Sequence, residues 1–170
     1  MNVITGNKKS FLNQRGFSLI ELMIVIAIIG TLLAISGGAY SSWRGNARVD
    51  SAKEKIVSVL QQTRLTALSQ GATQTTTFNY TGAAASPNTL VDVRGQTHTF
   101  QNVTLEDFVC GTCALGVDNT DAINFQPGGT ATTLTMRVSS PGSAKMFYVL
   151  VNPVTGRVDV RKTCTGGVCS

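Results

Sequence analysis

Four cysteines are the residues best suited to chemistry in this chain, and they form two close pairs. Two residues separate Cys110 from Cys113, and four separate Cys164 from Cys169. Paired cysteines are common ligands of tetrahedral zinc, and in an oxidising compartment they form disulfides. Four cysteines allow three connectivities, so the tail either closes its own loop or is joined to the 110–113 loop. No βαβ pattern surrounds Cys110 and Cys113, which argues against thioredoxin-like redox chemistry.

The carboxylates and the histidine do not form a catalytic set. His98 is the only histidine. Glu106 and Asp107 are adjacent, so in a strand they face opposite sides and cannot share a proton. Asp118 and Asp121 are suited to calcium, but the EF-hand spacing is absent. The chain also lacks a glycine-rich phosphate loop and a Ser-His-Asp arrangement, so we expect neither an enzyme, nor a cofactor, nor a metal site.

Cations accumulate towards the C-terminus. Residues in alternate positions of a strand share a face, so Arg157, Asp159 and Arg161 should lie together. Such a strand is either a sheet edge protected by its charge or a surface for phosphate contacts with DNA. Between residues 137 and 162, Asp159 is the one acid against five bases, namely Arg137, Lys145, Arg157, Arg161 and Lys162.

The amino-terminal part of the chain contains one long apolar run. From residue 19 to residue 35, 14 of 17 residues are apolar, although the mean hydropathy of the whole chain is only +0.13. As a helix, residues 17–40 would be ~36 Å long, enough to cross a hydrocarbon core of ~30 Å. Lys8, Lys9 and Arg15 precede the run without any acid. This asymmetry predicts a single span with its N-terminus in the cytoplasm.

Glu21 interrupts the apolar run near its start. A charge at the centre of a membrane helix costs on the order of 2.5–3.5 kcal/mol, and less near an end, so such residues are usually paired and functional. A cleavable secretory signal is the alternative, with residues 34–36 (Ala-Ile-Ser) as a weak cleavage site. That reading predicts loss of the whole apolar run on maturation.

The sequence RGFSLIEL, from Arg15 to Leu22, resembles the signal of type IV pilins and pseudopilins. Their pattern is a short basic leader ending in Gly, then Phe, then an apolar helix interrupted by Glu at the fifth mature position. The resemblance implies that the prepilin peptidase cleaves between Gly16 and Phe17 and that Phe17 is N-methylated. It also implies that Glu21 neutralises the terminal amine of a neighbouring subunit during assembly.

The remainder predicts an α+β head. Apolar residues recur at helical spacing from Val49 to Ala67, and Gly71 is a suitable terminator. From residue 72 onward the sequence predicts short strands, and the short connections between them favour antiparallel pairing. We therefore expect a leader (1–16), a hydrophobic stem helix (17–43), an amphipathic half of that helix (44–70) and a β-rich head (71–170), in which the helix packs on an antiparallel sheet or small sandwich. The expected strands are 73–80, 89–94, 97–105, 122–126, 132–139, 145–152 and 157–162.

The head resembles the H-type pseudopilin and minor-pilin group. The segments LQQTRLTALSQG, INFQPGG and MFYVLVNPVTGRVDVRK carry this likeness. It implies a minor pilin at the tip of a type IV pilus; the alternatives are a type II secretion pseudopilin and a DNA-binding minor pilin. DNA-binding members have Gly-Arg-x-Arg near the C-terminus, but here Asp159 replaces the second Arg, leaving Arg161 and Lys162 to compensate.

The resemblance also implies a location and partners. The protein would be a single-pass protein of the bacterial inner membrane with a periplasmic head, before it enters a pilus or pseudopilus filament. An oxidising periplasm favours disulfides over zinc at the four cysteines. The implied partners are the prepilin peptidase, the inner-membrane assembly platform and other minor and major pilins or pseudopilins.

Overall fold

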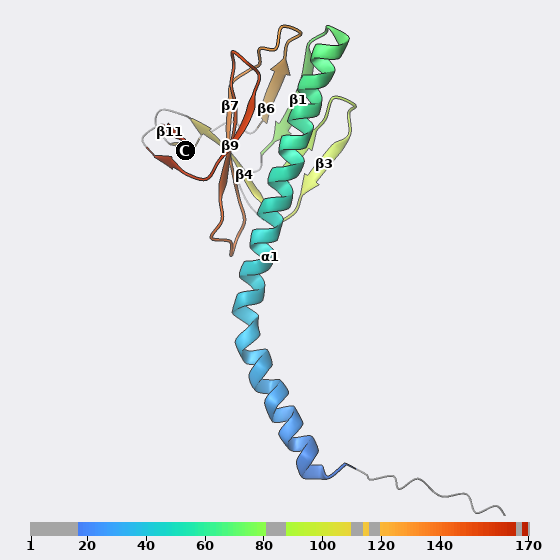
Figure 1. The fold of residues 1–170 in the computed structure, drawn as a ribbon, viewed down its shortest axis with the longest axis vertical. Helices are drawn as coiled ribbons and strands as arrows, with labels where there is room; N and C mark the ends of the chain where they lie inside the picture. The colour runs from blue at the N-terminus through green and yellow to red at the C-terminus, as the bar shows by residue number, and fades with distance from the viewer. Residues whose placement is uncertain (1–16, 81–87, 110–113, 116–119, 166–167, 170) are drawn as a thin grey trace, which may run out of the picture. The chain divides into compact units, whose positions relative to one another are not determined.

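The computed structural model describes residues 17–80, 88–109, 114–115, 120–165 and 168–169, without the side chains of residues 35–39, 109, 114–115, 120, 165 and 168–169. The chain divides into two compact units, Met1–Gly37 and Gly38–Ser170. One helix, α1 (Leu19–Gln70), contributes residues to both units (Figure 1). Among the described residues, no helix combines the length and apolarity needed to cross a membrane.

The second half of α1 is the amphipathic helix that the sequence predicts. Its apolar stripe is buried throughout, at Val49, Ala52, Ile56, Val59, Leu60, Thr63 and Ala67. The helix ends at Gln70, and Gly71 follows with a φ of 61°. Glycine adopts this left-handed conformation without a Cβ clash, which is why it commonly follows the last helical residue.

Two antiparallel sheets form most of the head. The first has the order β3-β2-β1-β6, and the second has the order β5-β4-β7-β8-β9. A small hairpin of β10 and β11 follows near the C-terminus. The strands are β1 (Gln74–Asn79), β2 (Asn88–Val91), β3 (Thr97–Phe100), β4 (Thr104–Val109), β5 (Ala114–Leu115), β6 (Thr120–Phe125), β7 (Leu134–Ser139), β8 (Phe147–Val151), β9 (Val158–Arg161), β10 (Cys164–Thr165) and β11 (Val168–Cys169).

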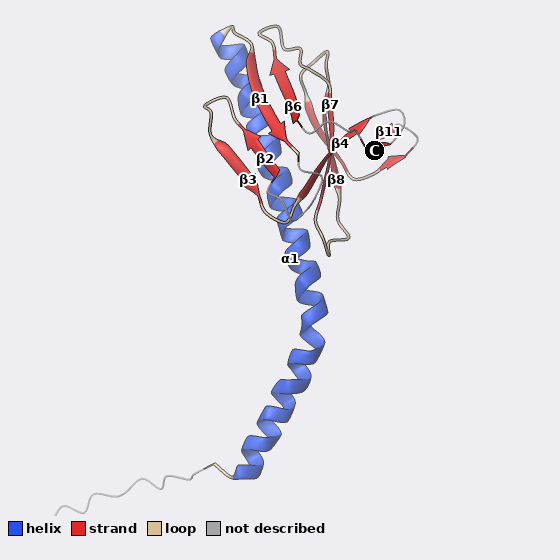
Figure 2. Ribbon diagram, turned by 180° about the vertical axis from the view of Figure 1, so that it is seen from behind, coloured by secondary structure: helices blue, strands red, loops and turns tan. Residues whose placement is uncertain are grey.

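Within this second unit, α1 runs along one side of the sheets, which Figure 2 shows from behind. Both sheets contribute to a single core with the helix: Phe78 and Leu90 come from the first, and Met136 and Val149 from the second. All four side chains are fully buried. The predicted α+β class, a long helix packed on antiparallel sheets, is confirmed.

One expected strand is two strands in different sheets. Residues 97–105 were expected to form one strand, but β3 ends at Phe100 and β4 begins at Thr104. Between them Asn102 has a φ of 55°. Asparagine tolerates this left-handed conformation better than most residues, and it interrupts the extended backbone. The chain thereby passes from the first sheet to the second, and β5, β10 and β11 are further strands that the sequence pattern missed.

Candidate functional site

Phe17 and Ser18 lie directly before α1, and Glu21 lies in its first turn. Phe17 precedes the helix with 79% of its surface exposed, and Glu21 is also exposed. The Ser18 carbonyl accepts hydrogen bonds from the backbone N–H of Glu21 at 3.0 Å and of Leu22 at 3.2 Å. Gly16, the other predicted processing residue, lies outside the described residues.

Ser18 is a residue that the sequence reasoning missed. The spacing Ser-x-x-Glu from Ser18 to Glu21 is that of a capping box, a common start of a helix. A carboxylate in the first turn also interacts favourably with the partial positive charge of the helix amino end. Glu21 is therefore placed where it stabilises its own helix, in addition to any contact with another chain.

The remaining described part of the first unit is an apolar helix surface. Exposed patches of this kind mark sites of contact with proteins or lipid, because isolated soluble domains rarely leave so much apolar area uncovered. Glu21 is the one charged side chain among residues 17–34. The exposed large hydrophobic residues are Leu19, Ile20, Leu22, Met23, Ile24, Val25, Ile26, Ile28, Ile29, Leu32 and Leu33.

The cysteine prediction is only partly within the described structure. Cys110 and Cys113 lie outside the described residues. Cys164 is disulfide-bonded, and its backbone lies opposite that of Cys169 in the β10–β11 hairpin. The connectivity of the four cysteines stays a prediction.

Two of the C-terminal cations are paired with carboxylates from distant segments. The Arg137 side chain on β7 donates from Nε to Glu106 Oε2 on β4 at 2.7 Å. Lys145 Nζ lies 2.9 Å from Asp50 Oδ2 on α1. The hydrogen bond from Lys145 is the main reason that the pKa of Asp50 lies below its ordinary value, against the opposing effect of desolvation. The count of charges along the sequence missed both pairs, because their acids lie 31 and 95 positions away.

A third cation is paired within its own strand region. Arg157 Nε lies 2.9 Å from Asp159 Oδ1, as expected for alternate residues on one face. Arg161 and Lys162 are exposed and form no ion pair among the described residues. Only these two members of the proposed DNA-contacting set are therefore unpaired in the described structure.

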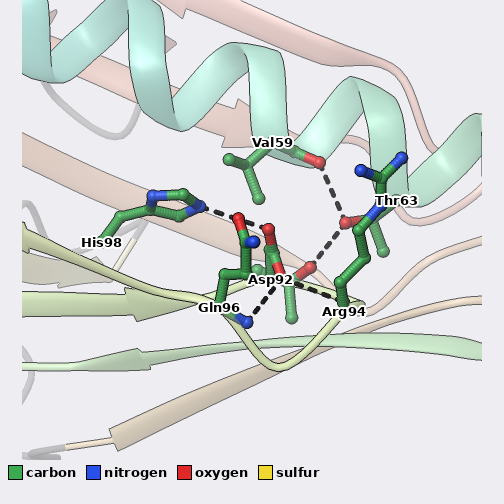
Figure 3. A network of polar contacts seen from close by, with 7 residues as sticks. Val59, Thr63, Asp92, Arg94, Gln96 and His98 are labelled. Atoms are coloured by element: carbon green, nitrogen blue, oxygen red, sulfur yellow. Dashed lines mark hydrogen bonds and ion pairs between the residues drawn. The ribbon is translucent and has the colours of Figure 1, made fainter.

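Asp92 organises the turn between β2 and β3 (Figure 3). Its Oδ1 accepts hydrogen bonds from the backbone N–H groups of Arg94 and Gln96, each at 2.9 Å. Its Oδ2 lies 3.2 Å from Nε2 of His98. Desolvation raises the pKa of Asp92, but the hydrogen bonds from Gln96, Arg94 and His98 together outweigh it, so the pKa lies below its ordinary value. His98 thus belongs to a structural contact at the sheet edge.

The described structure shows no calcium site formed by Asp118 and Asp121. Asp118 lies outside the described residues, and Asp121 accepts a hydrogen bond from the Tyr80 hydroxyl at 2.7 Å. Burial, followed by the effect of Asp121, raises the pKa of Tyr80. Within the described segments, no group of three or more His, Cys, Asp or Glu side chains is arranged to hold a metal ion.

The amino-terminal segment matches a known family. Residues 12–37 match the prokaryotic N-terminal methylation motif. Over 39 residues, the chain is 59% identical to a fimbrial protein of Moraxella nonliquefaciens and 54% identical to the type IV major pilin protein PilE1 of Neisseria gonorrhoeae. These matches cover 23% of this chain, which spans about a quarter of the length of those relatives (25% and 24%).

A solved structure resembles a larger part of the chain at low identity. The type IV minor pilin FimU of Pseudomonas aeruginosa aligns with 68% of this chain and 90% of its own, with a TM-score of 0.45 and 17% identity. A likeness at this level carries no argument about function. The amino-terminal segment therefore carries the prokaryotic N-terminal methylation motif and is similar to the corresponding segment of type IV pilins.

Proposed function

We propose that the chain is a minor pilin, a structural subunit that assembles near the tip of a type IV pilus with other minor and major pilins. The observation that carries this proposal is the match of residues 12–37 to the methylation motif. Within that segment we assign Gly16 and Phe17 to the cleavage site, Phe17 to methylation and Glu21 to assembly. The prepilin peptidase would cleave between Gly16 and Phe17 and leave Phe17 as the methylated N-terminus.

Glu21 is the proposed assembly residue. Cleavage exposes a cationic amine on Phe17, and Glu21 provides an anion in the first turn of the same helix. When helices with such apolar surfaces pack together, an unpaired charge is costly and an opposite charge on a neighbour offsets it. Pairing Glu21 of an incoming subunit with the Phe17 amine of an assembled one therefore favours one axial register.

The apolar surface of α1 explains how the subunit is held before and after assembly. Its leader contains Lys8, Lys9 and Arg15 without an acid, a pattern that retains this end in the cytoplasm. The proposed topology, which rests on the apolar run of residues 19–35 in the sequence, is a single span in the bacterial inner membrane with the head in the periplasm. On extraction by the assembly platform, the same apolar residues exchange lipid contacts for contacts with neighbouring helices.

The processing step is tested by intact mass spectrometry after co-expression with a prepilin peptidase. The expected product begins at Phe17 and is one methyl group heavier than the unmodified chain. Gly16→Leu should leave an uncleaved precursor, because a large residue precedes the scissile bond. A wild-type product that still begins at Met1 contradicts the prepilin assignment.

The assembly step is tested by quantifying the subunit in sheared pili. Glu21→Gln should be processed normally but incorporated at least about tenfold less, since an unpaired buried charge costs on the order of 3–5 kcal/mol. Glu54→Gln is the matched control, because Glu54 is an exposed acid on the head part of α1. Normal incorporation of Glu21→Gln contradicts the charge-pair mechanism. Wild-type chain found only with secretion pseudopilins would identify the type II secretion alternative.

A further inference from the structure

A groove with basic and aromatic residues lies between α1 and β3 in the second unit. It has a volume of about 740 Å³, within the range of about 300–1,000 Å³ that is usual for ligand sites. We call it the cationic groove and define it by Trp43, Arg44, Arg48 and Lys55 on α1 and by Thr97–Phe100 of β3. The four helix residues of the groove lie outside the methylation motif and outside the buried core.

The helical wall of the cationic groove carries a row of unopposed charge. Arg44, Arg48 and Lys55 are separated by four and seven positions, so they share one face of α1. The residues that line the groove include no carboxylate. Among the described residues, none of the three cations forms an ion pair. The groove therefore presents a local positive potential, and an acidic group entering it does not have to displace an internal partner.

The other wall is the open edge of a sheet. β3 is the terminal strand of its sheet and, in the described structure, pairs only with β2; it is the outermost strand of that sheet in Figures 1 and 2. An edge strand presents unpaired N–H and C=O groups that can accept an additional strand, and proteins usually protect such edges with charge or proline. The sequence of β3, THTF, has neither Lys nor Pro. By contrast, the β9 edge carries Arg157, Asp159 and Arg161.

Trp43 of the cationic groove and the neighbouring Tyr40 are two exposed aromatic residues. Trp43 and Tyr40 are 65% and 57% exposed, and their ring centroids are 6.2 Å apart. The Arg44 guanidinium lies 5.5 Å from the Tyr40 ring centroid. Trp, Tyr and Arg are the residue types most enriched among those that dominate binding energy at protein interfaces. Their exposure together indicates a contact surface.

We propose that the cationic groove binds an acidic, extended segment of a partner protein, which adds a strand to β3 and places its carboxylates against Arg44, Arg48 and Lys55. Strand addition supplies main-chain hydrogen bonds, and the side chains that alternate along the added strand give specificity. If the chain is a pilus subunit, as proposed above, this segment belongs to a neighbouring subunit. One wall is the edge strand β3, which in the described structure pairs only with β2, and this favours a peptide over nucleic acid.

The test uses Trp43, the only tryptophan of the chain, as a fluorescent reporter in the full-length protein in detergent micelles. The probe is a capped peptide of alternating glutamate and threonine, compared with one of alternating glutamine and threonine. We expect a saturable change of Trp43 fluorescence with the acidic peptide only. Binding should weaken as salt is added, because the exposed charges are screened.

Two pairs of variants separate the groove from general charge. Arg44→Gln with Arg48→Gln should weaken binding by about three- to tenfold, since exposed ion pairs each contribute only modestly. Arg161→Gln with Lys162→Gln removes the same charge on β9 and beyond it, and should leave binding unchanged. Equal loss in both variants, with unchanged circular dichroism, overturns the assignment to the groove. No binding of the acidic peptide by the wild type overturns it as well.

Two further arms test the class of ligand. A peptide with N-methyl groups on alternate backbone nitrogens, placed to block pairing with β3, should bind at least about tenfold more weakly; equal binding overturns strand addition. A single-stranded oligothymidylate should compete poorly. If it binds more tightly than the peptide, and the Arg44 and Arg48 variant loses that binding, the groove is a nucleic-acid site and the peptide proposal is wrong.

The measurement does not depend on filament assembly, so the two proposals can fail separately. Loss of peptide binding with normal incorporation into pili overturns the groove alone. Peptide binding by a chain that never enters pili leaves the groove assignment intact and contradicts the proposed function.

Discussion

At the scale of single residues, Thr63 shows how a polar side chain is accommodated in the apolar stripe of α1. Its hydroxyl donates to the Val59 carbonyl at 2.9 Å and lies 2.6 Å from the Thr76 hydroxyl on β1 (Figure 3). Both threonines are fully buried. Because the Thr63 proton is directed to Val59, the Thr76 hydroxyl donates to Thr63. The pair joins the helix to the first sheet with its donors satisfied.

Replacing one threonine should be more damaging than replacing both. Thr63→Val removes the acceptor of the Thr76 hydroxyl, and a buried group left without its partner costs about 1–3 kcal/mol. Thr63→Val with Thr76→Val removes both polar groups and should be closer to wild type than either single variant. Urea denaturation followed by near-ultraviolet circular dichroism measures the free energies of unfolding. Additive losses would contradict a coupled pair.

Asp92 should make the free energy of unfolding of the head depend on pH in the acid range. Its pKa in the folded state lies below its ordinary value, so the ionised carboxylate stabilises the fold. This contribution is complete above the unfolded pKa of about 4 and is lost as the pH falls through the lower folded pKa. Asp92→Asn should therefore lower the free energy of unfolding at neutral pH and reduce its decline in acid.

The same urea titrations at a series of pH values measure this effect. Asp50→Asn is a useful comparison, because the pKa of Asp50 is also lowered but through Lys145 on another segment. Each variant should remove part of the acid dependence, and the double variant should remove more than either one. An unchanged pH profile in Asp92→Asn would contradict the role of the carboxylate.

At the scale of elements, two turns meet beside the carboxyl half of α1. One follows β6 and contains Gly129, and the other joins β8 to β9 and contains Gly156. A Cβ placed on Gly156 would lie 2.5 Å from the Gly129 carbonyl oxygen. The Arg64 side chain on α1 donates from an η nitrogen to the Thr155 carbonyl at 3.1 Å. The PGG and NPVTG segments, which are distant in the sequence, thus form one packed junction.

Gly156→Ala should destabilise the head more than the same change at Gly95. Both glycines have positive φ, 59° and 76°, and a non-glycine residue there costs about 1–2 kcal/mol. Only Gly156 has a close neighbour, whereas a Cβ on Gly95 would meet nothing within 4 Å. We expect a difference of at least about 1 kcal/mol in unfolding free energy, since overpacking usually costs about 1–3 kcal/mol. Equal losses of unfolding free energy in the two variants would contradict a tight packing between the turns that contain Gly129 and Gly156.

At the scale of the whole molecule, most of the net charge of +5 lies in the proposed leader. The chain has 14 bases and 9 acids, and the proposed leader contains three of the bases, Lys8, Lys9 and Arg15, with no acid. Removing residues 1–16 leaves 11 bases against 9 acids, a net charge of +2. The chain without the proposed leader is therefore close to neutral overall, and its positive potential is local to surfaces such as the cationic groove.

Processing should consequently shift the isoelectric point downwards from that of the precursor, about 9.3. Isoelectric focusing of the chain with and without a co-expressed prepilin peptidase measures this shift. Gly16→Leu should focus with the precursor under both conditions. A processed chain that focuses with the precursor would contradict removal of the basic leader.

Features that depend on neighbouring residues can be predicted from the sequence alone. RGFSLIEL identifies the prepilin signal, and the three- and four-residue spacing from Val49 to Ala67 identified the buried stripe of α1. Helical and strand periodicities relate residues within a few positions of one another, so an isolated segment is sufficient to show them. The α+β class follows from the order of these periodic segments.

The contacts between segments that are distant in the sequence become visible only in the folded chain. Asp50 neutralises Lys145 and Glu106 neutralises Arg137, so the basic C-terminal region is less basic than its sequence suggests. Asn102 divides an apparent strand between two sheets, and β3 comes to lie beside Arg44 and Arg48 on the helix. These contacts depend on how the strands of two sheets pack against α1. The periodicity of a single segment carries no information about this packing.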